Sequence, residues 1–155
     1  MSTPESAADV LDRELANTRR SGMVTGAAIA VASAGALFVI GALQLWSVIW
    51  LFGVYKYVPY ALLVLGAASV LLGSRVYSQN LRALLAAIVV MALGALGTGA
   101  WAVVTTMDGF LSLLGVLMPL GSIVGVIFAA MAWGPCARTA AARKRAAAAG
   151  FDLNL

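Results

Sequence analysis

The feature that most constrains the fold of this chain is a set of long apolar runs without charge. The first runs from Met23 to Phe52, thirty residues with no charged side chain, whereas a helix needs about twenty apolar residues to cross a bilayer. Three shorter runs of the same kind follow. The sequence therefore predicts an all-α integral membrane protein, a four-helix transmembrane bundle with spans at about 23–50, 58–73, 83–105 and 110–133.

Composition agrees with this class. The chain is 63% hydrophobic and 10% charged, against roughly 45–50% and 25% in soluble domains. So much apolar surface does not fit inside one small globule, and the bilayer is its natural solvent. The 155 residues divide into a transmembrane domain at 21–134, a cytoplasmic amphipathic helix at 1–20 and a basic Ala/Arg-rich tail at 135–155.

The first twenty residues are polar and carry a helix-start signal, with Pro4 at the first helical position. Apolar or small residues then recur at helical spacing, at Ala8, Leu11, Leu15 and Thr18. Two interpretations remain open: a solvated helix, which is favoured, or a helix that docks on the membrane or on a partner.

Basic residues set the expected orientation, because Lys and Arg concentrate on the cytoplasmic side of membrane proteins. Nine of the ten fall on one side of the predicted bundle: Arg13, Arg19, Arg20, Arg75, Arg82, Arg138, Arg143, Lys144 and Arg145. Lys56 falls on the other side. This predicts a bacterial plasma membrane protein with both termini cytoplasmic. A cleaved signal peptide ending near VASAG at 31–35 is disfavoured, because four acids precede the apolar run and the run continues past the site.

Small residues at four-residue spacing let membrane helices approach closely. The candidates for helix packing or oligomer contacts are Gly22, Gly26, Gly66, Ser69, Gly73, Gly121 and Gly125. The pattern is not specific, because twelve of the twenty-one residues at 23–43 are Gly, Ala, Ser or Thr. It predicts a tightly packed bundle, within one chain or between chains.

Pro119 lies inside the fourth span and predicts a kink there, either static, which is the default, or a moving hinge. Ser122 is close enough in sequence to satisfy the carbonyl that the proline frees near Gly115. Two weakly polar stripes accompany it: Gly94, Thr98, Trp101 and Thr105 in the third span, and Ser112, Gly115, Pro119 and Ser122 in the fourth. They either line a narrow wet path or, as we favour, form packed inner faces whose hydroxyls bond back to their own helices.

Aromatic and basic residues mark the two membrane surfaces. Interface anchors are expected at Trp46, Trp50, Tyr55, Lys56 and Tyr57. Residues 44–52 either extend the first helix or lie in the interface. Contacts with anionic lipids, worth about 1 kcal/mol each at the surface, are expected at Arg19, Arg20, Arg138, Arg143, Lys144 and Arg145.

The sequence offers no set of residues for site chemistry. It contains no histidine and one cysteine, which disfavours zinc sites, histidine-held haem and disulfides. No span holds an acid, which argues against proton-coupled or ion-coupled transport. Asp108 fits a solvated turn, and Cys136 is either a lone thiol, which is favoured, or a palmitoylation site. We therefore expect no catalytic, cofactor-binding or metal site, no cofactor and no enzymatic activity.

The function expected from these features is assembly, as a homo-oligomer or as an accessory subunit of a larger membrane complex. The alternative is a channel built from several copies and lined by the third and fourth spans. A weaker alternative is a subunit that binds lipid, quinone or pigment at the aromatic cluster Trp46, Trp50, Tyr55, Tyr57 and Tyr60. Expected partners are membrane lipids and other membrane subunits, and nucleic acid is not expected.

Overall fold

The structure is a computed structural model that describes residues 16, 21–48, 56–107 and 113–148. Within these ranges it contains five helices, α2 (Gly22–Val48), α3 (Val58–Tyr77), α4 (Leu81–Met107), α5 (Leu113–Met131) and α6 (Trp133–Ala148). Helices α2 to α5 are long and apolar enough to cross a membrane. The predictions of an all-helical fold and of four apolar helices are thereby confirmed. The predicted helix at 1–20 lies outside the described residues, apart from the helical Ala16.

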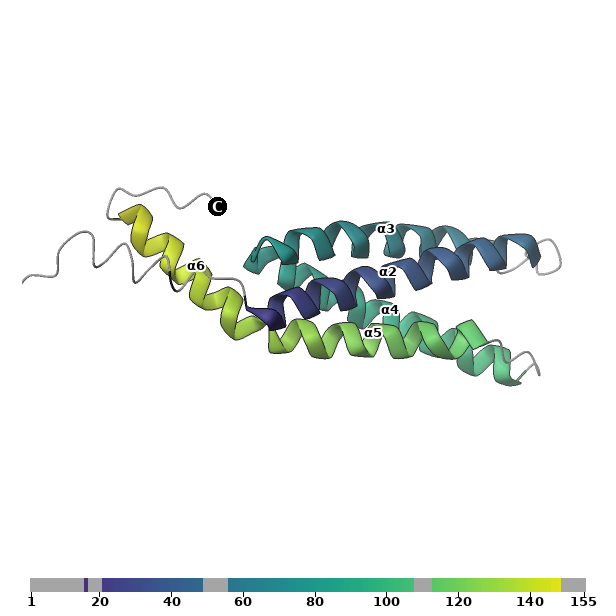
Figure 1. The fold of residues 1–155 in the computed structure, drawn as a ribbon. Helices are drawn as coiled ribbons and strands as arrows, with labels where there is room; N and C mark the ends of the chain where they lie inside the picture. Colours follow the sequence, from purple (N-terminus) through teal and green to yellow (C-terminus); the bar gives the residue numbers. More distant parts are fainter. Residues whose placement is uncertain (1–15, 17–20, 49–55, 108–112, 149–155) are drawn as a thin grey trace, which may run out of the picture.

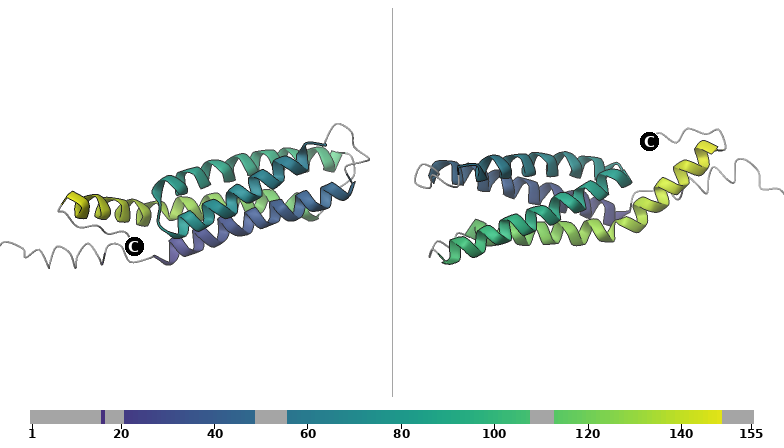
Figure 2. Two further views of the ribbon diagram at one scale, coloured as in Figure 1. Left: turned by 90° about the horizontal axis from the view of Figure 1, so that it is seen from above. Right: turned by 180° about the vertical axis from the view of Figure 1, so that it is seen from behind.

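Helices α2 to α5 run up and down and form an elongated bundle (Figure 1). Each helix packs against the next in the chain, and α5 closes the arrangement against α2. The contact between α2 and α3 is the most extensive of these. Helix α6 continues from α5 and projects beyond the end of the bundle at which α2 begins, as Figure 2 shows from two further directions.

The core of the bundle is built from large side chains that meet glycines of a neighbouring helix. Phe38 of α2 and Met91 of α4 are fully buried. A β-carbon added to Gly94 would lie 2.6 Å from the Phe38 ring, and one added to Gly125 would lie 2.9 Å from the Met91 sulfur. The glycines therefore provide the space that these side chains fill, as close packing requires.

Helix α3 is longer than the sequence predicts, because it continues past residue 73 to Tyr77. Arg75 lies in its last turn, where a positive charge interacts favourably with the free carbonyls of a helix end. Ser78 caps this end, since its Oγ donates a hydrogen bond to the Arg75 carbonyl at 2.8 Å. The predicted loop at 74–82 is therefore too long at its beginning.

Helix α4 begins at Leu81, two residues before the predicted start of the third span. The Asn80 side chain accepts hydrogen bonds from the backbone amides of Arg82 at 3.0 Å and Ala83 at 3.3 Å, which is the geometry of an N-cap. Gln79 has a φ of 58° and turns the chain between the two helices. The connection is therefore three residues long, 78–80.

The other boundaries differ by a few residues. The first predicted span, 23–50, corresponds to α2 as far as Val48, so 49–50 lie outside the described residues. The third span, predicted to end at 105, continues to Met107, and the fourth, predicted at 110–133, is α5 at Leu113–Met131. Helix α6 begins two residues before the predicted tail at 135–155.

A single residue, Ala132, separates α5 from α6. Its amide donates to the Phe128 carbonyl at 3.0 Å, and its carbonyl accepts from the Cys136 amide at 3.0 Å. Pro135 lies within the first turn of α6, where backbone amides have no partner inside the helix and a missing N–H costs little. The two helices therefore follow one another with little interruption in their hydrogen bonding.

Candidate interaction surface at the basic end

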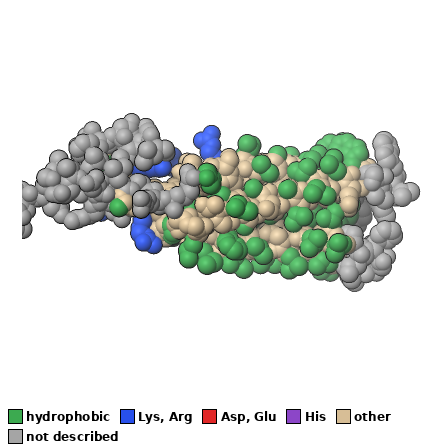
Figure 3. Space-filling view, in the orientation of Figure 1, with side chains coloured by type: hydrophobic (Ala, Val, Ile, Leu, Met, Phe, Trp, Pro, Cys, Tyr) green, Lys and Arg blue, Asp and Glu red, His purple; other side chains and the backbone are tan. Residues whose placement is uncertain are grey.

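Charge is concentrated at one end of the described molecule. Seven basic residues are described, and all but Lys56 lie at the end where α3 meets α4 and α6 projects: Arg75, Arg82, Arg138, Arg143, Lys144 and Arg145. On the face shown in Figure 3, blue side chains of Lys or Arg lie at this end, and apolar side chains lie along the bundle. None of the described residues is an acid. This end is therefore the candidate interaction surface of the part of the chain that the structure describes.

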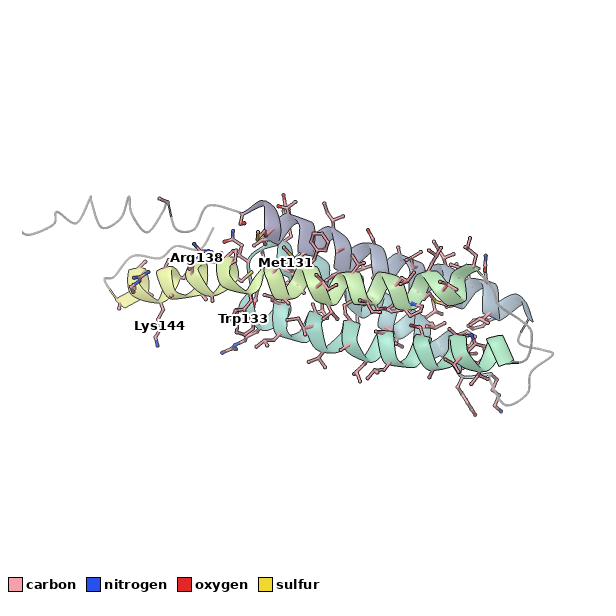
Figure 4. All side chains as sticks on the ribbon, turned by 90° about the horizontal axis from the view of Figure 1, so that it is seen from below. Met131, Trp133, Arg138 and Lys144 are labelled. Atoms are coloured by element: carbon pink, nitrogen blue, oxygen red, sulfur yellow. The ribbon has the colours of Figure 1, made fainter. Side chains whose placement is uncertain are left out.

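Helix α6 supplies four of these basic residues and is amphipathic. Its buried side consists of small residues, Cys136, Thr139, Ala142 and Ala146. Arg138, Lys144 and Arg145 are exposed. Figure 4 shows the side chains of Arg138 and Lys144 on opposite sides of α6, with Trp133 on the same side as Lys144. The basic residues therefore surround the helix outside its buried stripe.

Arg143 differs from its basic neighbours because it is half-buried. Its Nη2 donates a hydrogen bond to the Ser78 carbonyl at 3.4 Å, and its Nε is buried without a hydrogen-bond partner among the described residues. The guanidinium thus lies against the free carbonyls at the end of α3, where a cation is favourable. It connects α6 to the turn between α3 and α4, whereas Arg138, Lys144 and Arg145 are the exposed members of the predicted lipid contacts on α6.

Cys136 is fully buried in the first turns of α6. Burial raises the pKa of its thiol, and the positive charge of Arg143 lowers it by a smaller amount. Thr139, one turn later, donates its hydroxyl proton to the Pro135 carbonyl at 3.1 Å. The enclosed, protonated thiol resembles a packing residue rather than an acylation site.

The predicted packing residues contact other helices of the same chain. The nearest atoms to an added β-carbon belong to Phe128 for Gly26, Val39 for Gly66, Ala28 for Gly73, Leu37 for Gly121 and Met91 for Gly125. Ser69 is buried, and its hydroxyl donates to the Leu65 carbonyl at 2.6 Å. Gly22 has nothing within 4 Å. Apart from Gly22, these positions are therefore used for packing inside one chain.

The predicted stripes of α4 and α5 also face the inside of the bundle. Thr98 and Ser122 are buried, and their hydroxyls donate to the carbonyls of Gly94 at 2.6 Å and Met118 at 2.9 Å. This is the back-bonding that the packed-face interpretation predicts. Ser122 donates to the Met118 carbonyl within its own helix, and its expected role toward the carbonyl near Gly115 stays a prediction. Ser112 and the side chain of Thr105 lie outside the described residues.

Pro119 lies inside α5, which continues through it from Leu113 to Met131. Gly115, four residues earlier, is buried. The proline is therefore accommodated within one helix, as expected where neighbouring helices support the backbone of a membrane segment. The structure contains one conformation of this helix, and whether the position moves stays a prediction.

The described members of the predicted interface anchors, Trp46, Lys56 and Tyr57, lie at the end opposite α6. The rings of Trp46 and Tyr60 meet edge to face with centroids 4.9 Å apart, and Lys56 Nζ lies 5.1 Å from the centroid of the Tyr57 ring. The pair of Trp46 and Tyr60 joins α2 to α3, a role that the sequence did not indicate. Trp50, Tyr55, Arg19 and Arg20 lie outside the described residues.

No known protein family, no curated protein and no solved structure matches this chain.

Proposed function

We propose that this chain is an integral protein of the plasma membrane, with both termini in the cytoplasm, that acts as an accessory subunit of a larger membrane complex. The observation that carries the proposal is the separation of an apolar bundle from a basic end. Six of the seven described cations lie at that end, and four of them are on α6. A membrane anchor that presents a basic cytoplasmic helix would have this organisation.

The side chains exposed along the bundle support insertion in a membrane. Large apolar residues are exposed on all four helices, among them Ile29, Leu43, Val64, Leu71, Leu96 and Ile127. In water such a surface would drive aggregation, whereas lipid tails solvate it. The buried hydroxyls within the described spans, at Ser69, Thr98 and Ser122, are paired with backbone carbonyls, as a hydrocarbon environment demands.

The charge distribution supports the proposed orientation. The basic end carries both Arg75 and Arg82 beside the α3–α4 turn and the cations of α6, while Lys56 is the one described cation of the opposite end. Cytoplasmic segments near membrane spans are enriched in Lys and Arg. A single-cysteine topology experiment in a Cys136→Ala background tests this. With an impermeant maleimide, Lys56→Cys should react in intact cells, and Lys144→Cys only after permeabilisation.

The use of glycines inside the bundle supports an accessory role over an oligomer assembled through the same residues. Gly66, Gly121 and Gly125 each face a side chain of another helix of this chain. What remains for partners is α6 and the apolar outer surface. The channel alternative has less support, because the described hydroxyls of Thr98 and Ser122 face the packed interior and bond to their own helices.

Purification from host membranes in mild detergent, followed by native mass spectrometry, tests the proposed function. We expect other membrane proteins at fixed stoichiometry with this chain. A double variant Arg138→Glu, Lys144→Glu should lose them, whereas the control Lys56→Glu should keep them. A closed ring containing only this chain would contradict the accessory role and favour the channel alternative, which flux through liposomes would then measure.

A further inference from the structure

The buried stripe of α6 extends to the far end of a helix that projects from the bundle. Cys136, Thr139, Ala142 and Ala146 are 0%, 2%, 0% and 4% exposed. Figures 1 and 2 show the last turns of α6 beyond the ends of α2 to α5 in every view. Ala146 lies two residues from the end of α6. Its burial requires a neighbour that the four bundle helices do not supply.

The chemistry of this face indicates what kind of segment covers it. At 100° per residue the small residues form one stripe, with Arg138 and Arg145 along one flank and Arg143 along the other. Small side chains accept larger apolar ones at close range. The complementary partner is therefore a helix with an apolar stripe between acidic flanks, as in helix pairs that charged flanking residues hold in register.

We propose that the N-terminal segment, residues 1–20 of the same chain, docks as a helix on this face of α6. Its sequence has the complementary pattern: Ala8, Leu11, Leu15 and Thr18 share one side at helical spacing, with Glu14 on one flank and Glu5 and Asp12 on the other. Residues 1–20 contain four acids, all within 1–15, and three basic residues, of which Arg19 and Arg20 lie next to the start of α2, whereas α6 contains four basic residues and no acid. Apolar fit and charge thus select the same segment.

Connectivity and length agree with this assignment. The segment leads into α2 at Gly22, and α2 contacts α6 at the end of the bundle where α6 starts. Twenty helical residues span about 30 Å, and the sixteen residues of α6 span about 24 Å. A helix that ends beside the start of α6 pairs with it in the antiparallel sense. That places Leu15 and Thr18 near Cys136 and Thr139, with Ala8 and Leu11 near the other end of the stripe.

The other candidate segments fit less well. Residues 49–55 and 108–112 join helices at the opposite end of the bundle. Residues 149–155 follow α6 directly and include one acid, Asp152, against four acids in residues 1–15. The proposal does not depend on the accessory role, because it concerns contacts within one chain.

Double electron–electron resonance, which measures the distance between two spin labels, tests the docking. The labels are placed at Ala16→Cys and Ala141→Cys, two exposed positions, in a Cys136→Ala background, with the full chain reconstituted in phosphatidylcholine vesicles. We expect one narrow distance distribution. Arg138→Glu with Arg145→Glu should broaden it, and the added changes Glu5→Lys, Asp12→Lys and Glu14→Lys should restore it. The matched control, Arg75→Glu with Arg82→Glu, makes the same charge change outside α6 and should leave the distribution narrow.

A broad distribution in the parent protein would overturn the proposal. A narrow component that disappears on dilution with unlabelled chain would also overturn it, because the docked segment would then come from a second copy. A narrow component that appears only when anionic lipid is present would overturn it as well. The charge-reversed variants are accompanied by a salt series on the parent. Raising salt to about 1 M, where the Debye length is about 3 Å, should broaden the distribution. If neither salt nor charge reversal changes the width of the distance distribution, the proposed docking through complementary charges is also overturned.

Discussion

Gly35 of α2 and Gly66 of α3 meet backbone to backbone: a β-carbon added to either would lie 2.8 Å from the carbonyl oxygen of the other. Ser69 completes the crossing, since its Cβ would lie 2.8 Å from a β-carbon on Gly35. Helices in lipid associate largely through such close packing, because burial of apolar surface gives them little. The absence of side chains at both positions is therefore a condition for the most extensive helix contact of the bundle.

Gly66→Ala should destabilise the protein by about 1–3 kcal/mol, the usual cost of overpacking a tight interior. The added methyl group meets the Gly35 carbonyl and the backbone of Val39, neither of which moves without shifting α2. Gly97→Ala is the matched control on a helix surface, because nothing lies within 4 Å of its added β-carbon. Thermal unfolding in detergent measures both. Equal midpoints for the two variants would contradict the close crossing.

Arg143→Gln should loosen α6, because it removes the charged group that bonds to the Ser78 carbonyl and lies at the end of α3. Hydrogen exchange at the amides of 133–148 should accelerate by about five- to tenfold, corresponding to about 1 kcal/mol for one hydrogen bond. Lys144→Gln removes an exposed cation from the same helix, on the side away from its buried stripe, and serves as the control. Identical exchange in the two variants would mean that Arg143 does not position α6.

Cys136 should react slowly with maleimides in the folded protein. Burial raises the pKa of its thiol above the ordinary value of 9.0, and the thiolate is the reactive form. Because the unfolded chain ionises near the ordinary value and the folded chain does not, the free energy of unfolding should fall as the pH rises through that value. Labelling rates in native protein and in denaturant, compared across pH, measure both effects. Equal rates would contradict the burial.

Thr98→Val and Ser122→Ala should leave liposomes that contain the protein tight to ions, and the stability of the protein close to its original value. Each hydroxyl bonds to a carbonyl of its own helix, which already accepts a helical hydrogen bond, so its removal should cost no more than about 1 kcal/mol. Thermal midpoints and ion flux in liposomes check this. Flux in the parent protein that these substitutions alter would support the channel alternative instead.

The spans were predictable because each is an uninterrupted apolar run longer than the hydrocarbon core requires. Their ends were less predictable where polar residues continue a helix. Arg75 and Ser78 look like loop residues in the sequence, yet the first interacts with the end of α3 and the second caps it. Asn80 ahead of an apolar run is a helix-start signal that would have placed the start of α4 correctly.

The packing partners could not be predicted, because sequence spacing shows which residues share a face of one helix but not which face of another helix they meet. Gly35 lies within VASAG, a stretch that resembles a signal-peptide cleavage site, and only its contact with Gly66 reveals its role in packing. The basic character of α6 was visible in the sequence. The partial burial of Arg143 was not, because it depends on the position of the α3–α4 turn.

The junction at Ala132 has a mechanical consequence. Hydrogen bonds from the Ala132 amide to the Phe128 carbonyl and from the Cys136 amide to the Ala132 carbonyl continue the helical pattern from α5 into α6. The two helices are therefore mechanically coupled. A rotation of α6 would be transmitted along α5 toward Pro119, which has no backbone N–H and so leaves out one hydrogen bond of that helix. A protein bound to α6 would therefore act on the interior of the bundle through α5.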